Sequence, residues 1–232
     1  LVTRPLLGWW TRRLAVQPVV RKAELLRGGC TEEEAAQLNG RSLLALSSGI
    51  AHGFGCVLFP EGTSHSQSHM IRFKTGPVRT LLAAAALAKA NDLPLPHMVP
   101  VGLHYRRREH FRTDKFVEFG EPIELDEASI PTEMVDAVGR GGWVEPPQAT
   151  VHRVRDQLQA HLPTLTPNTS TWEEHRALHL MAHAKARDSG TRLTSWQDEV
   201  LAAREVRRAW PNRVASFPPD PLEGGSLRSA SE

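Results

Sequence analysis

The sequence has few cysteines, no long hydrophobic run and almost no net charge. Its two cysteines, Cys30 and Cys56, lie far apart, which gives neither a disulfide framework nor a C-x2-C zinc motif and is typical of thiols that stay reduced. The longest unbroken apolar run, Leu81 to Ala88, is far short of the roughly 20 residues that cross a bilayer. A net charge of +2 over 232 residues produces no strong field, so we predict no nucleic-acid partner.

The remaining composition is that of an ordinary soluble domain, with 40% hydrophobic and 23% charged residues. It excludes collagen, a coiled coil and a fully disordered chain. No signal-peptide pattern is present. Because the sequence starts at Leu1 rather than at a methionine, we expect it to open inside a longer protein.

Short apolar runs alternate with helical patterns, which predicts an α/β fold: a mixed, largely parallel sheet layered with helices, plus a C-terminal helical extension. The predicted strands are 14–20, 56–59, 98–103 and 116–119, and the predicted helices are 31–51, 78–90, 171–186 and 195–209. Residues 126–165 read as turn-rich sequence around one short helix. We therefore expect one domain over 1–165, a helical extension over 166–210 and a disordered tail over 211–232.

The most informative stretch is Phe59-Pro-Glu-Gly-Thr63, which follows a predicted strand. Gly62 lets a ligand approach the backbone, and Thr63 offers a hydroxyl. Loops beyond the carboxyl ends of strands are where open α/β sheets bind ligands. The same residues also make an ordinary turn, so spacing alone leaves both interpretations open.

Three blocks in order resemble the glycerolipid (PlsC-like) acyltransferases, which acylate glycerol-3-phosphate and lysophosphatidic acid. Phe59-Pro-Glu-Gly-Thr63 is similar to the third block of that family. Gly8-Trp-Trp followed by Gln17-Pro-Val-Val-Arg21 resembles the second block, and Val99-Pro-Val-Gly102 resembles the fourth. The resemblance covers residues 1 to about 125 and fades by about 185.

The resemblance implies acyl transfer from an acyl thioester, either acyl-CoA or an acyl carrier protein, to a glycerol phosphate in phospholipid synthesis. It implies no metal and no prosthetic group, because the thioester is a co-substrate. It also implies work at the cytoplasmic face of a membrane as a peripheral protein. Trp9 and Trp10 beside two arginines fit an interfacial element, and they fit ordinary core aromatics equally well.

Carried over residue by residue, the resemblance predicts a substrate-binding set: Arg21, Glu61, Gly62, Thr63, Lys74, Val101 and Gly102. The Arg21 guanidinium suits a phosphate because it forms two parallel charge-assisted bonds. Glu61 would repel a phosphate, so we expect it to accept a hydrogen bond from Arg21, from a loop N–H or from the glycerol hydroxyl. Val101 and Gly102 would line the acyl-chain floor, or serve only as strand core.

One family block is missing from the printed sequence. Family members carry a His-x4-Asp block before the second block, in which the histidine is the general base. The only His-x4-Asp here is His183 with Asp188, inside a predicted helix far downstream, and we interpret it as coincidence. We therefore predict no catalytic residue in these 232 residues and no turnover by them. The alternative is a non-catalytic module that binds glycerol phosphate or anionic lipid.

Several other histidines and arginines receive a plain interpretation. We interpret His65 and His69 as parts of a polar loop, with His65 able to touch substrate, rather than as a nucleophile's base or a metal pair. His175, His179 and His183 recur at helical spacing, which favours a solvated or half-buried stripe over a metal face. The Arg106–Arg108 cluster favours a solvated turn or a lipid headgroup contact over nucleic acid.

Overall fold

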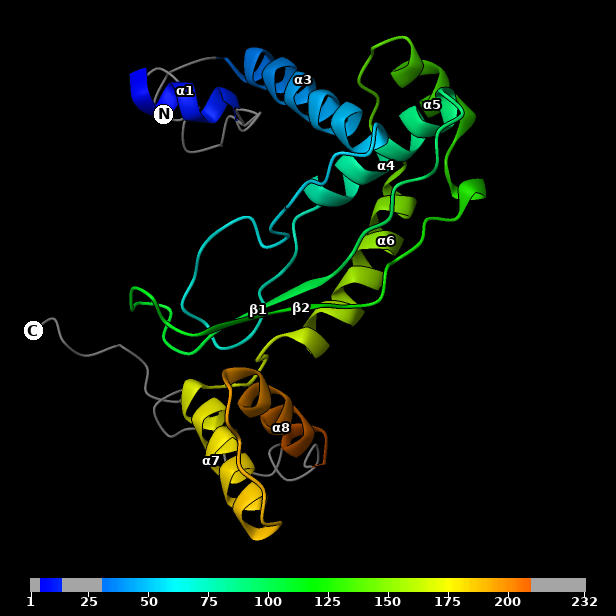
Figure 1. The fold of residues 1–232 in the computed structure, drawn as a ribbon. Coiled ribbons are helices and arrows are strands. Elements are labelled where there is room, and N and C mark those ends of the chain that lie inside the picture. The colour runs from blue at the N-terminus through cyan, green and yellow to red at the C-terminus, as the bar shows by residue number, and fades with distance from the viewer. Residues whose placement is uncertain (1–4, 14–30, 210–232) are drawn as a thin grey trace, which may run out of the picture. The chain divides into compact units, whose positions relative to one another are not determined.

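The protein is represented by a computed structural model that describes residues 5–13 and 31–209 (Figure 1). The predicted strand 14–20, Arg21 and the tail 211–232 lie outside the described residues. Within the described part the chain forms two compact units. The first holds residues 5–13, 31–66, 70–102 and 119–165, and the second holds 67–69, 103–118 and 166–209.

Seven α-helices and two strands are described. In chain order they are α1 (Pro5–Arg13), α3 (Glu32–Ala51), α4 (Gly76–Ala90), β1 (Val101–Tyr105), β2 (Lys115–Phe119), α5 (Thr132–Gly139), α6 (Gln148–His161), α7 (Trp172–Asp188) and α8 (Trp196–Ala209). Two short 3-10 helices cover Glu127–Ser129 and Leu162–Leu165. The helices predicted over 31–51, 78–90, 171–186 and 195–209 are thus all present, and the second of them begins two residues earlier than predicted, at Gly76.

The capping residues explain where the helices begin. At the start of α3, Glu34 N donates to Thr31 Oγ1 at 3.1 Å and Thr31 N donates to Glu34 Oε2 at 2.8 Å, which closes the predicted capping box. At the start of α7, Glu174 N donates to Thr171 Oγ1, while the carboxylate of Glu174 reaches back to Ser170 N instead of to the cap residue. The local sequence therefore determines where α3 and α7 begin.

Helix α4 forms the core of the first unit. Ala83, Ala84, Ala85, Ala86 and Ala88 are fully buried, and α3, α5 and α6 pack against this helix. Alanine side chains let neighbouring helices approach closely without a cavity. The α3 helix is tied to α4 by the hydroxyl of Ser47, which donates to Thr80 O at 3.0 Å.

The described residues contain one two-stranded antiparallel sheet, β1 paired with β2. Met98 and Ile123 extend this pairing as an isolated antiparallel bridge, and Pro100 O accepts a hydrogen bond from Gly120 N at 2.8 Å. Proline thus stands just before the strand, where its missing N–H costs nothing. The strand predicted over 116–119 is confirmed, and the one predicted over 98–103 begins at Val101 instead.

The structure differs from the prediction at residues 56–59, which form a loop and not a strand. Val57 and Phe59 are 83% and 68% exposed. A strand needs a hydrogen-bonded neighbour, and among the described residues none pairs with 56–59. The largely parallel sheet remains a prediction.

Residues 126–165 were also predicted incorrectly, because they hold two helices, α5 and α6, rather than one short one. Both helices begin after a proline, Pro131 and Pro147, and neither has a side-chain cap. The apolar spacing of Val151, Val154 and Leu158 is helical, and all three side chains are buried.

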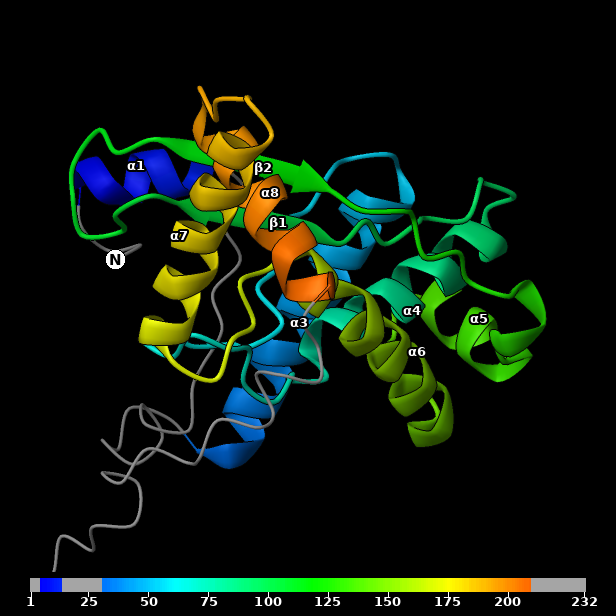
Figure 2. The ribbon, with the colours of Figure 1, turned by 90° about the horizontal axis from the view of Figure 1, so that it is seen from below.

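The second unit pairs α7 with α8 (Figure 2). Leu178 and Ala182 of α7 pack with Ala203 and Val206 of α8. These helices also contact the hairpin of β1 and β2: Trp196 Nε1 donates to His104 O at 3.1 Å. Hydrogen bonds therefore tie the C-terminal helix α8 to a hairpin from the middle of the sequence.

Candidate functional site

The Phe59–Thr63 stretch folds as a tight turn in the long segment between α3 and α4, which Figure 1 draws as a cyan trace. Gly62 N donates to Phe59 O at 3.1 Å and closes the turn. Gly62 has φ +68°, a left-handed conformation that favours glycine. Glycine is therefore favoured at position 62 because the turn needs a left-handed backbone there.

Lys74 lies against this turn. Its backbone N–H donates to Pro60 O at 2.7 Å. Its side chain passes over Gly62, because a Cβ built there would stand 3.0 Å from Lys74 Cγ. Two residues predicted separately, Gly62 and Lys74, are thus brought together, and the Lys74 side chain is exposed.

Glu61 is held by two donors from the same loop. Ile71 N donates to Glu61 Oε2 at 3.0 Å, and His65 Nε2 hydrogen-bonds to that same oxygen. The side chains of Glu61 and His65 are 20% and 23% exposed. Of the three partners expected for Glu61, the loop N–H is therefore present. His65 is an additional partner that the sequence analysis did not assign to Glu61.

A buried anchor fixes the end of this loop. Phe73 is 3% exposed and packs with Ile123, Leu158 and Leu162. Lys74 follows this anchor directly, and α4 begins two residues later at Gly76. The base of the loop is therefore held by a hydrophobic contact on one side and by the α4 core on the other.

Thr63 sits at the exposed outer end of the turn. Its hydroxyl lies 3.5 Å from Ser64 O, at the outer limit of a hydrogen bond. A hydroxyl in this state can donate to a bound anion at little cost.

The other predicted site residues lie elsewhere or are not described. Val101 is half-buried and Gly102 is buried, and both begin β1. The hydrogen bonds of Glu61, Gly62 and Lys74 join residues within 59–74, and Val101 and Gly102 take no part in them. Arg21 lies outside the described residues, so its approach to the turn stays a prediction.

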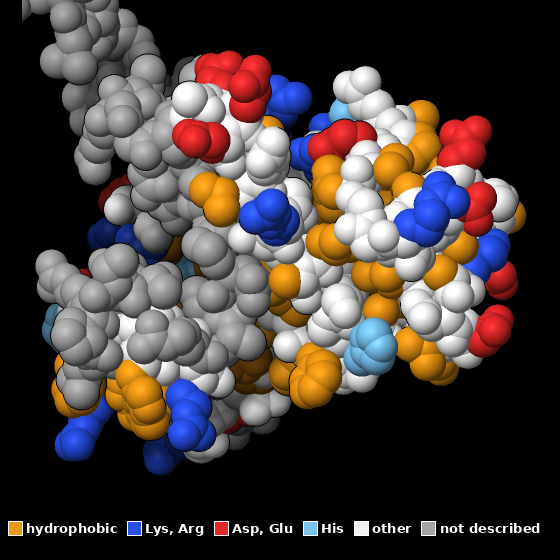
Figure 3. Space-filling model, turned by 90° about the horizontal axis from the view of Figure 1, so that it is seen from above, with side chains coloured by type: hydrophobic (Ala, Val, Ile, Leu, Met, Phe, Trp, Pro, Cys, Tyr) orange, Lys and Arg blue, Asp and Glu red, His pale blue; other side chains and the backbone are white. Residues whose placement is uncertain are grey.

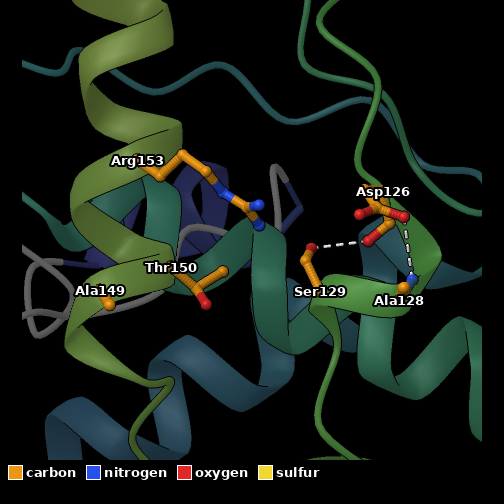
Figure 4. A pocket seen from close by; sticks show the side chains of 6 residues that line it. All are labelled: Asp126, Ala128, Ser129, Ala149, Thr150 and Arg153. Carbon is orange, nitrogen blue, oxygen red and sulfur yellow. Dashed lines mark hydrogen bonds between the residues drawn. The ribbon is translucent and has the colours of Figure 1, made fainter.

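A shallow pocket of about 410 Å³ lies between the 3-10 helix Glu127–Ser129 and the start of α6 (Figure 4). It is lined by Asp126, Ala128, Ser129, Ala149, Thr150 and Arg153. Asp126 caps the short helix by accepting from Ala128 N at 3.0 Å. None of the predicted substrate-binding residues lines this pocket.

The histidine stripe of α7 packs against aromatic side chains. His179 stacks on Trp196 with ring centroids 5.2 Å apart, and it contacts His175 edge-on at 4.7 Å. Burial, together with the neighbouring His175, lowers the pKa of His179 from 6.5 to about 4. His183 Nε2 lies 3.4 Å from Glu199 of α8. The half-buried stripe is therefore a packing feature of this unit.

The described residues hold neither a metal cluster nor a membrane-spanning helix. No group of three or more His, Cys, Asp or Glu side chains there is arranged to hold a metal ion. Among the same residues no helix combines the length and the apolar character that crossing a membrane requires.

The chain is similar to three curated proteins of fungi. It is 29% identical to glycerol-3-phosphate O-acyltransferase 2 of Saccharomyces cerevisiae, over 65% of the chain and 19% of that protein. It is 30% identical to glycerol-3-phosphate O-acyltransferase 1 of the same yeast, over 53% of the chain and 15% of that protein. An uncharacterized acyltransferase of Schizosaccharomyces pombe is 34% identical over 38% of the chain and 12% of its own length.

The chain spans less than a fifth of the length of each of these relatives. No protein-family model and no solved structure matches the chain. The matches agree with one another in the chemistry that their names state.

Proposed function

Because this chain belongs to the glycerolipid acyltransferase family, we propose that it takes part in acyl transfer from an acyl thioester, acyl-CoA or an acyl carrier protein, to a glycerol phosphate. The observation that carries the proposal is the turn at Glu61–Thr63 with Lys74 laid over it. Two of its yeast relatives are named as glycerol-3-phosphate O-acyltransferases, which supports glycerol-3-phosphate or its monoacylated form as the substrate that receives the acyl group.

In this reaction a glycerol hydroxyl oxygen attacks the thioester carbonyl carbon. A C–O bond forms, the C–S bond breaks, and the hydroxyl proton passes through a general base to the departing thiolate. The chain's own contribution is to bind and orient the glycerol phosphate, because holding the two reactants in line lowers the entropic part of the barrier.

The phosphate would bind at Lys74. The aliphatic part of its exposed side chain passes over Gly62, where the lack of a Cβ leaves room for this close approach. The hydroxyl of Thr63 offers a second donor from the same turn. The start of α4, two residues beyond Lys74, adds the positive end of a 15-residue helix. Arg21 would complete the cationic set.

Val101 and Gly102 are the residues proposed to contact the acyl chain. Gly102 is buried and Val101 is half-buried at the start of β1. We propose that they line the floor along which the acyl chain lies, on a largely parallel sheet that residues 14–20 would join. No metal or prosthetic group is required by this scheme.

We propose that the 232 residues alone bind without turnover. Their only His-x4-Asp pair starts at His183, which lies inside α7 beside Glu199. The second candidate function, a non-catalytic module that holds glycerol phosphate, rests on this same observation. The two candidates differ in one measurement: turnover of glycerol-3-phosphate and acyl-CoA by the longest form of the protein that its gene encodes.

A titration of the 232-residue protein with glycerol-3-phosphate tests the binding site. We expect shifts in the amide NMR signals of residues 60–76, and Lys74→Ala should weaken binding about tenfold, the loss of one charge-assisted contact. Lys89→Ala is the matched control, since Lys89 lies at the far end of α4 beside Glu127. Equal effects of both substitutions would contradict a phosphate site at Lys74.

We also propose a peripheral position at the cytoplasmic face of a membrane. Trp9 and Trp10 of α1 are 46% and 54% exposed, and the Arg13 guanidinium lies over the Trp9 ring at 5.1 Å. Tryptophan beside arginine suits the headgroup zone of a bilayer. The space-filling view shows hydrophobic side chains exposed between Lys and Arg side chains on one face (Figure 3).

A further inference from the structure

The two oxygens of the Glu61 carboxylate have different surroundings. His65 Nε2 and Ile71 N both hydrogen-bond to Oε2. Among the described residues Oε1 has no hydrogen-bond partner. A carboxylate can accept about four hydrogen bonds, so Oε1 retains its full accepting capacity. The two donors to Oε2 also fix the direction in which Oε1 points.

An ionised carboxylate donates no hydrogen bond and repels a phosphate. The group that it recognises best is a hydroxyl. The Lys74 ammonium belongs to the same turn, because its side chain passes over Gly62, the residue next to Glu61. A cation and an oriented carboxylate at one turn suit a ligand that has a phosphate at one end and a hydroxyl at the other.

We propose that His65 is a positioning residue that, together with Ile71 N–H, holds Oε2 of Glu61 so that Oε1 accepts a hydrogen bond from a hydroxyl of the glycerol phosphate. The inference rests on the proposed function and adds the means by which the site tells a phosphorylated polyol from a bare phosphate. His65 acts through Glu61 and does not itself touch the ligand.

The atom of His65 that matters for this role is Nε2, because it makes the hydrogen bond to Glu61 Oε2. Phenylalanine keeps the ring size and removes the donor. Glutamine places its amide nitrogen about where Nε2 stands and restores a donor. His69, four residues further along the same polar stretch and exposed, provides a matched control position.

The experiment is a pair of titrations of the 232-residue protein, one with sn-glycerol 3-phosphate and one with inorganic phosphate, followed by amide NMR shifts. The wild type should prefer glycerol 3-phosphate about tenfold, the contribution of one charge-assisted hydrogen bond. His65→Phe should abolish this preference and leave the affinity for inorganic phosphate within about twofold. His65→Gln should keep most of the preference, and His69→Phe should keep all of it.

A loss of affinity for both ligands in His65→Phe would mean only general damage to the loop and would overturn the positioning role. Full preference in His65→Phe would overturn it as well. If the wild type binds neither ligand, the proposed function falls and this inference falls with it. Binding of both ligands by the wild type keeps the proposed function, whatever His65→Phe then does to the preference.

Discussion

Lys74 Cγ occupies the space beside Gly62 that a Cβ would need, at 3.0 Å from the ideal Cβ position. The backbone of Gly62 is also left-handed, with φ +68°. Each of the two features alone disfavours a side chain at this position. The turn and the lysine are therefore specified together, although twelve positions of sequence separate the two residues.

Gly62→Ala should disturb the site through both features. The left-handed backbone costs about 1–2 kcal/mol for a residue with a Cβ, and the Lys74 side chain must move away. We expect weaker glycerol-3-phosphate binding in an NMR titration, together with a melting temperature that is lower by a few degrees. Gly55→Ala is the matched control in the same inter-helix segment, because nothing lies within 4 Å of a Cβ there. Unchanged affinity in Gly62→Ala would refute the close approach.

Arg204 should be the most sensitive charged residue of the second unit. Its guanidinium hydrogen-bonds to both carboxylate oxygens of Glu118, and the two side chains are 9% and 18% exposed. Removing Arg204 takes away the bidentate partner of Glu118 and leaves the carboxylate facing His104 Nε2, which is 3.5 Å away. Arg204→Met should therefore lower the free energy of unfolding by about 3 kcal/mol in urea. Arg208→Met, an exposed position on the same helix, should change it by less than about 0.5 kcal/mol.

The same pair should make the stability of the protein depend on pH in the acid range. The hydrogen bond from Arg204 holds the pKa of Glu118 below its usual value, despite the opposing effect of burial. The pair therefore stabilises the folded state fully above the usual glutamate pKa, and this stability is lost as the pH falls through the lowered value. Arg204→Met should flatten the acid limb of the stability profile, and an unchanged limb would argue against the pairing.

His179 predicts a second, separate pH dependence. Its pKa of about 4 in the folded state lies below the 6.5 of an exposed histidine, so protonation favours the unfolded chain. Stability should be constant above pH 6.5 and should fall between pH 6.5 and pH 4, by on the order of 2–3 kcal/mol. Thermal melts across this range measure it.

His179→Phe should keep the stack on Trp196 and remove most of the loss between pH 6.5 and pH 4. His161→Gln, at the exposed end of α6, should leave the profile as it is in the wild type. A profile for His179→Phe that matches the wild type would assign the dependence to other groups, such as His175, whose pKa burial also lowers.

The tryptophans of α1 give a prediction for the membrane proposal. Trp9→Ala combined with Trp10→Ala should lower the amount of protein that sediments with vesicles containing anionic lipid by about tenfold. Trp172→Ala, which removes a tryptophan of α7 that is 39% exposed, serves as the control. Equal sedimentation of all three proteins would leave α1 with no part in membrane binding.

Local signals explain which parts of the fold were predictable. The capping box at Thr31 and the proline after Gly76 specify helix starts within a few residues, and both helices are present. Helix α6 was missed because its start at Pro147 has no side-chain cap, although Val151, Val154 and Leu158 have the spacing that could have identified it. The hairpin was unpredictable as a partner of α8 because Glu118 and Arg204 stand 86 positions apart.

The candidate site was predictable in its residue types and not in its contacts. The motif identified Glu61, Gly62 and Lys74, and the structure brings these three together. The role of Ile71 depends on its backbone N–H, which cannot be inferred from the type of its side chain. His65 had one available signal, its place four residues after Glu61, but that spacing brings side chains together on helices and not in general in loops.

The fully buried alanines of α4 limit how this site can respond to a ligand. A shift of the helix would drive these methyl groups into the helices packed around it, so we expect α4 to move little. Lys74 thus lies close to the fixed N-terminal end of α4, and its neighbour Phe73 is buried in a hydrophobic cluster. Adjustment on ligand uptake must then come from residues 63–69, and amide exchange rates before and after loading should change in that stretch while those of α4 stay constant.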